Sequence, residues 1–498
     1  MKYITIHNNQ AVPVSEIPES DYEAFLELNA GFVQQSVERH CVSYFGYVSG
    51  AGVKLVCCIA DDQSHEIYVS SSLVQTDQKL PSFTARHTCF EKFERELHEN
   101  FGISYSDHPW MKPVRYAHDR YDKGDTIGDY PFYSIESEEL HEVGVGPIHA
   151  GVIEPGHFRF ICNGEKILHL EIQLGYQHRG VERLFTEKKP LNQLATLAEN
   201  IAGDTAVGHS VAFAQLWECL SGFETSRDVD YARTIALELE RIAIHTGDLS
   251  AVCTDIAYQL GSSVFGRLRT PIINFMQEWC GNRLSKGLIR PGRNKYPFTQ
   301  ALAGRLTEVL DRFEPDFIEM NRELFLLPSA LSRFERTGVV TAEDASAIGA
   351  VGMAARASGL SRDIRKSHPH ALYPELGHEP VVKRHGDVYS RVQVRKEEVY
   401  QSVAYLRKLL EDIPGNAEKE TLQSPGRDLF ALSLVEGWRG EICHCAVTGP
   451  DGSLKVYKVK DPSFHNWMAL ALAVRNNEIS DFPICNKSFN LSYCGHDL

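Results

Sequence analysis

The first 135 residues combine helical and strand-like patterns of hydrophobic positions. Residues 20–39 carry apolar side chains at helical spacing, so the sequence predicts a helix there. Alternating apolar positions predict three strands after it, at residues 42–49, 53–60 and 65–74. A second helix within residues 87–103 is predicted by the spacing of Phe90, Phe93, Leu97 and Phe101. A stretch rich in Pro and Asp, from Asp107 to about Glu139, is typical of a linker, and we place a domain boundary near residue 135.

The rest of the chain, residues 136–498, is dominated by helical patterns. Two runs of alternating apolar and polar residues lie within residues 158–176, on either side of a Gly-Glu pair. Together they predict a β-hairpin. Helices are predicted at residues 190–222, 230–250, 255–283, 298–325, 342–359 and 397–413. Residues 440–463 read as a strand, a Pro-Asp-Gly turn and a strand. The predicted fold class is α+β, with a small α/β domain (1–135) followed by a large helix-dominated domain with a β-hairpin (136–498).

Composition narrows the class of protein. The 498 residues include 51 Lys and Arg against 66 Asp and Glu, a net charge of −15, which argues against a nucleic-acid partner. No apolar run approaches the roughly 20 residues of a membrane-spanning helix. The first ten residues lack the cationic and apolar segments of a signal peptide. We therefore expect a soluble cytoplasmic protein, which could dock on a membrane-bound assembly.

Twelve cysteines are scattered along the chain, and none forms a C-x-x-C pair. This excludes the usual zinc-ribbon, thioredoxin-like and iron–sulfur ligand patterns. Cys443 and Cys445 lie two apart on a predicted strand, so both side chains face the same way. They could bind a metal, or they could be two small side chains packed on one face of the strand.

Four short stretches place ionisable side chains beside Gly or Pro, where the backbone shape is fixed and side chains can be aimed into a cleft. They are residues 146–151 (GPIHAG), 175–182 (GYQHRGVE), 199–210 (ENIAGDTAVGHS) and 461–466 (DPSFHN).

At these residues the chain resembles the large subunit of membrane-bound, complex-I-like nickel–iron hydrogenases of the formate hydrogenlyase type. It also resembles the quinone-site subunit of respiratory complex I. The segments EPGHFRF, LELERIAIHTGDL, ARASGLSRDIR and VEGWRGEICH carry the same resemblance. The N-terminal segment FEKFERELHENFGISYSDHPWM is similar to the small accessory subunit of complex I, which is often fused to the large one. The resemblance covers nearly the whole chain.

The chain departs from the hydrogenases at the metal ligands. The family holds its nickel–iron centre with thiolates from C-G-x-C and D-P-C-x-x-C motifs. These positions fall here on Ala202, Thr205, Ser463 and Asn466. Alanine cannot ligate, and neutral oxygen ligands are poor substitutes for thiolates. We therefore predict no nickel–iron centre and no other metal at these positions, a departure typical of the energy-converting hydrogenase-related type.

In complex I, the cavity that corresponds to the metal site of the hydrogenases takes a quinone headgroup. The resemblance therefore implies that this chain could protonate a quinone there. In complex I, a histidine of the hairpin loop, hydrogen-bonded to an aspartate, is thought to protonate the quinone. The two positions fall here on His149 and Asp255, with His245 as a second histidine. The quinone-binding tyrosine falls on Gly203, so one quinone oxygen would lose its partner. We expect Asp204 and His209 to line the space instead.

The resemblance assigns roles to three further residues. Glu182 falls on the glutamate that relays protons in the hydrogenases, and Arg179 is expected near it. His178 and Arg179 resemble the residues that face the [4Fe-4S] cluster of a small partner subunit. The expected assembly thus contains that iron–sulfur subunit, antiporter-like membrane subunits and other subunits, with this chain peripheral on the cytoplasmic face of the inner (plasma) membrane.

We expect an oxidoreductase subunit that couples electron transfer to protonation by His149, Asp255 and Glu182. A link to NADH follows only from the resemblance, because no G-x-G-x-x-G follows a predicted strand. A non-catalytic scaffold or coupling subunit is the alternative. For the individual residues, a turn at His149, an ion pair at Glu182 or a helix cap at Asp461 are the plain structural interpretations.

Overall fold

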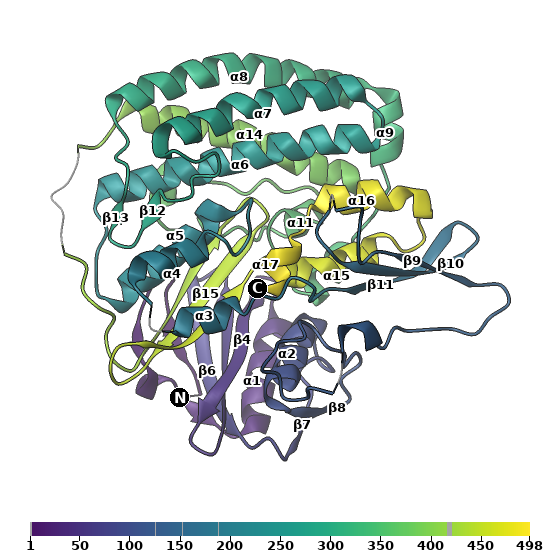
Figure 1. Cartoon of the computed structure of the whole chain (residues 1–498), viewed down its shortest axis with the longest axis vertical. Coiled ribbons are helices and arrows are strands. Elements are labelled where there is room, and N and C mark those ends of the chain that lie inside the picture. The colour runs from purple at the N-terminus through teal and green to yellow at the C-terminus, as the bar shows by residue number, and fades with distance from the viewer. Residues whose placement is uncertain (1, 125, 152, 188, 416–420) are drawn as a thin grey trace.

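The computed structural model describes residues 2–124, 126–151, 153–187, 189–415 and 421–498. Three layers follow one another in Figure 1, with the N-terminal sheet at the bottom, a second sheet with the C-terminal helices in the middle and a layer of long helices at the top. The predicted α+β class is confirmed.

The N-terminal layer is an antiparallel sheet in the order β1-β6-β5-β4, with β3 added in parallel to β6. Helices α1 and α2 cover one face, and Phe25, Tyr44, Phe93 and Leu97 form the core between them. The elements are β1 (Ile4–Ile6), β2 (Val12–Pro13), η1 (Val14–Glu16), β3 (Glu19–Ser20), α1 (Tyr22–Gln35), β4 (Arg39–Ser49), β5 (Gly52–Asp61), β6 (Glu66–Val74), β7 (Lys79–Pro81), η2 (Thr88–Phe90), α2 (Glu91–Phe101), β8 (Ser104–Ser106) and η3 (Ile127–Asp129).

The second layer is a four-stranded sheet in the order β16-β15-β14-β2. One face packs on the N-terminal sheet through a shared core that includes Phe45, Val56, Phe430 and Leu432. Helices α3–α5 and the C-terminal helices surround the sheet. The elements are α3 (Val181–Thr186), α4 (Leu191–Ala198), α5 (Ala206–Leu220), β14 (Leu429–Glu436), β15 (Glu441–Thr448), β16 (Leu454–Lys460), α15 (Ser463–Ala473), η4 (Ile479–Asp481), α16 (Phe482–Phe489) and α17 (Tyr493–Asp497).

The third layer contains the four long helices α6, α7, α8 and α14 (Figure 1). The helix predicted at 230–250 is confirmed as part of α6, and its side chains at Ile235, Leu239, Ile242 and Leu249 are fully buried. The elements are α6 (Arg227–Asp255), α7 (Gln259–Cys280), β12 (Ile289–Arg290), β13 (Arg293–Asn294), α8 (Gln300–Leu326), α9 (Pro328–Phe334), α10 (Ala342–Ala347), α11 (Gly352–Ala357), α12 (Ile364–Ser367), α13 (Tyr373–Leu376) and α14 (Val388–Glu411).

The hairpin prediction is confirmed and extended. Strands β10 (His157–Asn163) and β11 (Lys166–Gln173) pair antiparallel, and β9 (His141–Val145) adds a third strand on the other side of β10. This sheet projects from the body of the molecule at the right of Figure 1.

Three segment predictions were wrong. The helix expected at 342–359 is two short helices, α10 and α11, because the chain leaves the helical conformation at residues 348–351, where Gly349 has a positive φ. The helix expected at 190–222 is broken between α4 and α5, because the turn around Gly203 ends one helix before the next begins. The stretch expected to be a linker is not a loose connection. Its buried Arg115 side chain forms an ion pair with Glu96, and Glu99 accepts hydrogen bonds from the backbone amides of Val114 and Arg115.

The boundary near residue 135 stays a prediction. The two regions nevertheless share structure, since β2 completes the sheet of the second region by pairing with β14. A domain cut there would remove an edge strand and half of a hydrophobic core.

Candidate functional site

The α4–α5 turn carries the first pair of positions where the hydrogenases have thiolates. Ala202 and Thr205 are both fully buried there. Arg439 donates two hydrogen bonds of 2.6 Å to the two carboxylate oxygens of Asp204, and a third of 3.0 Å to Thr205 Oγ1. Its Nε donates to the carbonyl oxygen of Asn490 at 2.6 Å. A bidentate guanidinium–carboxylate pair thus fixes this turn, although the Asp204 side chain stays partly exposed.

The second pair, Ser463 and Asn466, lies in the first turns of α15. Ser463 Oγ accepts a hydrogen bond of 2.9 Å from the amide of Ser492. The Asn466 side chain both accepts from and donates to the backbone of Val351, at 3.1 and 3.0 Å. Their polar atoms are therefore used inside the protein.

These residues do not fit a nickel–iron centre. The four positions supply no thiolate, and three of the four side chains hydrogen-bond to protein groups. Within the described ranges, no group of three or more His, Cys, Asp or Glu side chains is arranged to hold a metal ion. The side chains at these positions serve hydrogen bonding within the protein.

A row of four hydrogen-bonded side chains lies directly beneath the α4–α5 turn. His209 Nε2 is 3.1 Å from Asp461 Oδ2, and His209 Nδ1 is 3.0 Å from His444 Nε2. His444 Nδ1 is 2.7 Å from the hydroxyl of Tyr457. All four side chains are almost completely buried. Both ring nitrogens of His209 are thus occupied, and the expectation that His209 lines an open space was wrong.

The pKa values in this row favour one distribution of protons. Burial, aided by His209, lowers the pKa of His444 far below its ordinary value, so this imidazole is neutral. Burial raises the pKa of Asp461, but the hydrogen bond from His209 and the charge of Arg439 outweigh it and leave the pKa lowered. A consistent assignment has Tyr457 donating to His444, His444 donating to His209, and His209 donating to the Asp461 carboxylate. Such a row can pass a proton by shifting each hydrogen to the next acceptor.

Cys443 and Cys445 lie on either side of His444 in β15 and point toward the N-terminal sheet. Their sulfur atoms are 3.5 Å apart, and both side chains are 1% exposed. They belong to the core shared by the two sheets, together with Cys58. This packing agrees with the interpretation as small core side chains.

A cavity of about 590 Å³ brings together His178 and Arg179, the residues expected to face the partner's cluster, and Glu182, the residue expected to relay protons. His178 Nδ1 is 2.8 Å from the carbonyl oxygen of Asp497. Arg179 donates to the carbonyl oxygens of Asn200 and Ile201, at 2.6 and 2.8 Å, and so is bound to the segment just before Ala202.

Arg179 lines the same cavity as Glu182, but the two do not form the ion pair of the plain structural interpretation. The Glu182 carboxylate accepts hydrogen bonds from Lys458 Nζ at 2.7 Å and from the amide of Val459 at 3.0 Å. Lys458 also contacts Glu96 at 2.6 Å. The lysine is the partner because β16 passes beside α3, whereas the Arg179 guanidinium is already engaged with carbonyl groups. A second cavity, of about 320 Å³, has both Glu182 and Tyr457 among its lining residues, whereas the Tyr457 hydroxyl itself is turned toward His444.

His149 and Asp255 are not hydrogen-bonded to each other in the described part of the chain. His149 Nε2 is 2.8 Å from the carbonyl oxygen of Gly156, so this nitrogen carries the proton and Nδ1 remains for exchange. Asp255 lies at the exposed end of α6. Partial burial raises its pKa, and Lys487 opposes this. The expected pair fails because the hairpin loop supplies its own acceptor for the histidine.

His245, the second histidine, is held rigidly in the helical layer. Its Nε2 is 2.9 Å from Glu398 Oε2, and its Nδ1 is 3.1 Å from Arg395 Nη1. Burial lowers the pKa of His245 to about 4 despite Glu398. The imidazole is therefore neutral, donating to the carboxylate and accepting from the arginine.

One titratable group near the turn was not predicted. Glu240 on α6 is 3% exposed, and its carboxyl oxygens accept hydrogen bonds from the amides of Val207 at 2.7 Å and Gly208 at 3.2 Å. Burial raises the pKa of Glu240 to about 8. The sequence gives no specific signal for it, because Glu240 lies in a helical segment that also contains Glu238 and Arg241, as an ordinary helix surface would.

Comparison with known proteins yields matches to two family models. Residues 25–124 match the family described as the respiratory-chain NADH dehydrogenase 30 Kd subunit, and residues 261–428 match the 49 Kd subunit of the same enzyme. The chain is 26% identical to hydrogenase-4 component G of Escherichia coli (strain K12), over 98% of this chain and 87% of that protein.

Two further relatives carry complex I names. Identity to the second D-type NADH-quinone oxidoreductase subunit of Sorangium cellulosum is 30%, over 65% of this chain and 85% of the relative. Identity to the C/D-type NADH-quinone oxidoreductase subunit of Phocaeicola vulgatus is 27%, over 78% of this chain and 82% of the relative.

Proposed function

Because the chain belongs to the family of the 49-kDa subunit of NADH-quinone oxidoreductase, with a 30-kDa-type region fused at its N-terminus, we propose that it couples electron transfer to proton uptake in a membrane-associated complex. The chain is an oxidoreductase subunit of the complex I and hydrogenase type. In the proposal, electrons arrive from a [4Fe-4S] cluster of a small partner subunit, and antiporter-like membrane subunits translocate protons. The described residues include no helix long and apolar enough to span a bilayer, and we place the chain peripherally on the cytoplasmic face.

The observation that carries the proposal is the buried row Tyr457–His444–His209–Asp461. Tyr457, at one end of the row, and Glu182 are both among the residues that line the 320 Å³ cavity, and Asp461, at the other end, lies near Arg439. A completely buried chain of two imidazoles, a phenol and a carboxylate is costly unless every member is hydrogen-bonded. Transfer of protons from the side of Glu182 to the α4–α5 turn would explain why these polar side chains are buried despite the free-energy cost.

Quinone is the candidate electron acceptor. Reduction to quinol takes up two electrons, here from the partner's cluster, and two protons. His149 can supply or accept a proton at Nδ1, since Nε2 is fixed by Gly156. Asp255 remains a candidate second proton group, with no hydrogen bond to His149 among the described residues. Gly203 leaves open space where the family's tyrosine would stand, because a Cβ atom there would meet no atom within 4 Å.

The test uses the purified complex in sealed vesicles, with a reduced low-potential dye as donor and a water-soluble quinone as acceptor. We expect His209→Gln to slow quinone reduction at least tenfold while the complex stays assembled. His385→Gln, a change of an exposed histidine, is the matched control. Normal turnover of the His209 variant would contradict the relay. No quinone reduction by the unaltered complex would contradict quinone as the acceptor.

A scaffold or coupling role without chemistry is the second candidate. It is favoured by the internal hydrogen bonds of Thr205, Ser463 and Asn466, which fill the former ligand positions. Under this alternative, His149→Gln and His209→Gln variants turn over normally, whereas disruption of the Phe90–Phe101 helix prevents assembly of the complex.

A further inference from the structure

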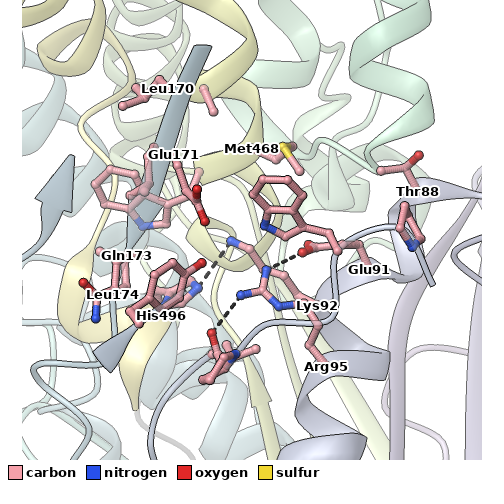
Figure 2. Close-up of a pocket in the computed structure, with 18 of the residues that line it drawn as sticks. Thr88, Glu91, Lys92, Arg95, Leu170, Glu171, Gln173, Leu174, Met468 and His496 are labelled. Atoms are coloured by element: carbon pink, nitrogen blue, oxygen red, sulfur yellow. Dashed lines mark hydrogen bonds and ion pairs between the residues drawn. The ribbon is translucent and has the colours of Figure 1, made fainter. Parts of the chain in front are cut away.

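A separate cavity of about 250 Å³ lies between α2, β11, α15 and α17, where the N-terminal region meets the C-terminal helices (Figure 2). Its walls are largely apolar and include two tryptophans. They are formed mainly by Trp110, Leu170, Leu174, Trp467, Met468 and Ala471. This volume is below that of most drug-sized sites and suits a smaller molecule.

The two carboxylates that line the cavity are already neutralised. Glu91 forms an ion pair with Arg95, one helical turn away. Glu171 accepts from Lys112 Nζ at 2.6 Å through one oxygen and from the amide of Tyr133 at 2.8 Å through the other. A cationic ligand would therefore have to displace an existing partner.

The Lys92 ammonium group has no such carboxylate partner among the described residues. Its Nζ is 3.3 Å from His496 Nε2, the one hydrogen bond found for it, and 5.7 Å from the centre of the Phe464 ring. His496 Nδ1 is 2.8 Å from Asp497 Oδ1. Burial, with Lys92 and Arg115 nearby, lowers the pKa of His496 far below its ordinary value, so this ring is neutral and its Nε2 accepts from the lysine. Two of the three N–H groups of Lys92 remain for a ligand.

A second nitrogen on the wall is also unsatisfied. His169 Nε2 is buried and has no hydrogen-bond partner in the described ranges. Arg475, at the rim, adds a further positive charge near it. The lining thus combines apolar surface with the Lys92 ammonium group, which has no carboxylate partner among the described residues, and with a ring nitrogen of His169 that has no hydrogen-bond partner there.

We propose that this cavity binds a small organic carboxylate with an apolar or aromatic body, whose carboxylate accepts hydrogen bonds from Lys92. A neutral ligand would leave the lysine donors unsatisfied in a largely dry site, which is costly. A nucleotide polyphosphate is too large for the volume and carries more negative charge than the lining balances. The aromatic walls suit a flat apolar body stacked beside Trp110 or Trp467.

The test uses the purified full-length protein and its tryptophan fluorescence, since Trp110 and Trp467 line the cavity. Three probes of similar shape are titrated into the protein: benzoate, which is an anion, benzyl alcohol, which is neutral, and benzylamine, which is a cation. We expect saturable binding of benzoate, at least tenfold tighter than that of the other two. Lys92→Met, which keeps the aliphatic stem, should weaken benzoate at least tenfold and leave benzyl alcohol unchanged. Lys166→Met, a change of an exposed lysine outside the cavity, is the control.

A second variant keeps the test decisive if Lys92→Met fails to fold. Ala471→Leu adds volume at the wall and should abolish the fluorescence response to every probe. The proposal is overturned if benzoate binds the Lys92 variant as tightly as the unaltered protein, or if the three probes bind equally well. Absence of a saturable response in the unaltered protein, or an unchanged response in Ala471→Leu, would overturn it too.

Discussion

Arg439 and Asp204 form a bidentate pair, with both hydrogen bonds 2.6 Å long, that joins the loop between β14 and β15 to the α4–α5 turn. The guanidinium is nearly buried, whereas 36% of the Asp204 side chain is exposed. In place of sulfur-bound metals, an ion pair between two chain segments holds this part of the former ligand site together.

Arg439→Lys should therefore destabilise the protein without any change of net charge. Lysine cannot bond both carboxylate oxygens and also reach the Asn490 carbonyl. We expect the free energy of unfolding to fall by about 2 kcal/mol, a value kept low because Asp204 is partly exposed. Urea unfolding measures the change. Arg312→Lys, on the exposed face of α8, is the control, and equal stability of the two variants would show that the bidentate geometry is unimportant.

Removal of one hydroxyl group tests the role of Tyr457 at the end of the buried row Tyr457–His444–His209–Asp461. Tyr457→Phe takes away the donor to His444 Nδ1 and leaves the stacked ring beside Phe185 in place. We expect turnover of the complex to fall at least tenfold and its solvent isotope effect to change. Tyr231→Phe removes another buried hydroxyl, which donates to the Leu409 carbonyl far from the row, and should retain turnover. If both variants behave alike, Tyr457 has no specific role.

Gly203→Tyr tests whether a quinone binds in the space at the α4–α5 turn, because it restores the tyrosine that the family has at this position. The added side chain meets no nearby atom at its Cβ position, so the fold should tolerate it. A restored hydroxyl would supply one hydrogen bond of about 1 kcal/mol, and we expect the KM for a water-soluble quinone to fall about fivefold to tenfold. Gly304→Tyr, on the exposed surface of α8, is the matched change. An unchanged KM in the Gly203 variant would place quinone binding elsewhere.

The lysine of the small cavity gives a prediction about pH. Burial lowers the pKa of Lys92 from its ordinary 10.5 to about 7, with Arg95 and Arg115 adding to the effect and Glu91 and Asp497 opposing it. Between these two pH values the unfolded chain binds more protons than the folded protein, so raising the pH stabilises the folded state. The contribution of Lys92 to the free energy of unfolding rises by at most about 1.4 kcal/mol per pH unit.

Urea unfolding at pH 7, 8 and 9 measures this contribution. The stability of the unaltered protein relative to Lys92→Met should increase over this range, because the variant lacks the titrating group. The same measurements on Lys166→Met control for the loss of one exposed lysine. A stability difference that stays constant with pH would show that the Lys92 ammonium group is as accessible as in the unfolded chain.

The sequence by itself determined the major helices, the hairpin and the loss of the metal ligands. Periodicity identified α6 and α8 because burial of one helical face fixes which positions are apolar. The resemblance to the hydrogenases places Ala202, Thr205, Ser463 and Asn466 where that family has thiolates, and residue type alone then says that these side chains supply none.

Only the tertiary structure decided how the polar groups are paired. His209, His444 and Asp461 come from three separate segments, and no local spacing indicates that they form one row with Tyr457. His149 bonds to the backbone of its own loop instead of Asp255, and Glu182 pairs with Lys458 instead of Arg179, for the same reason. A buried hydrogen bond goes to whichever partner the packed chain brings within about 3 Å, and that proximity is a property of the assembled layers rather than of the sequence pattern.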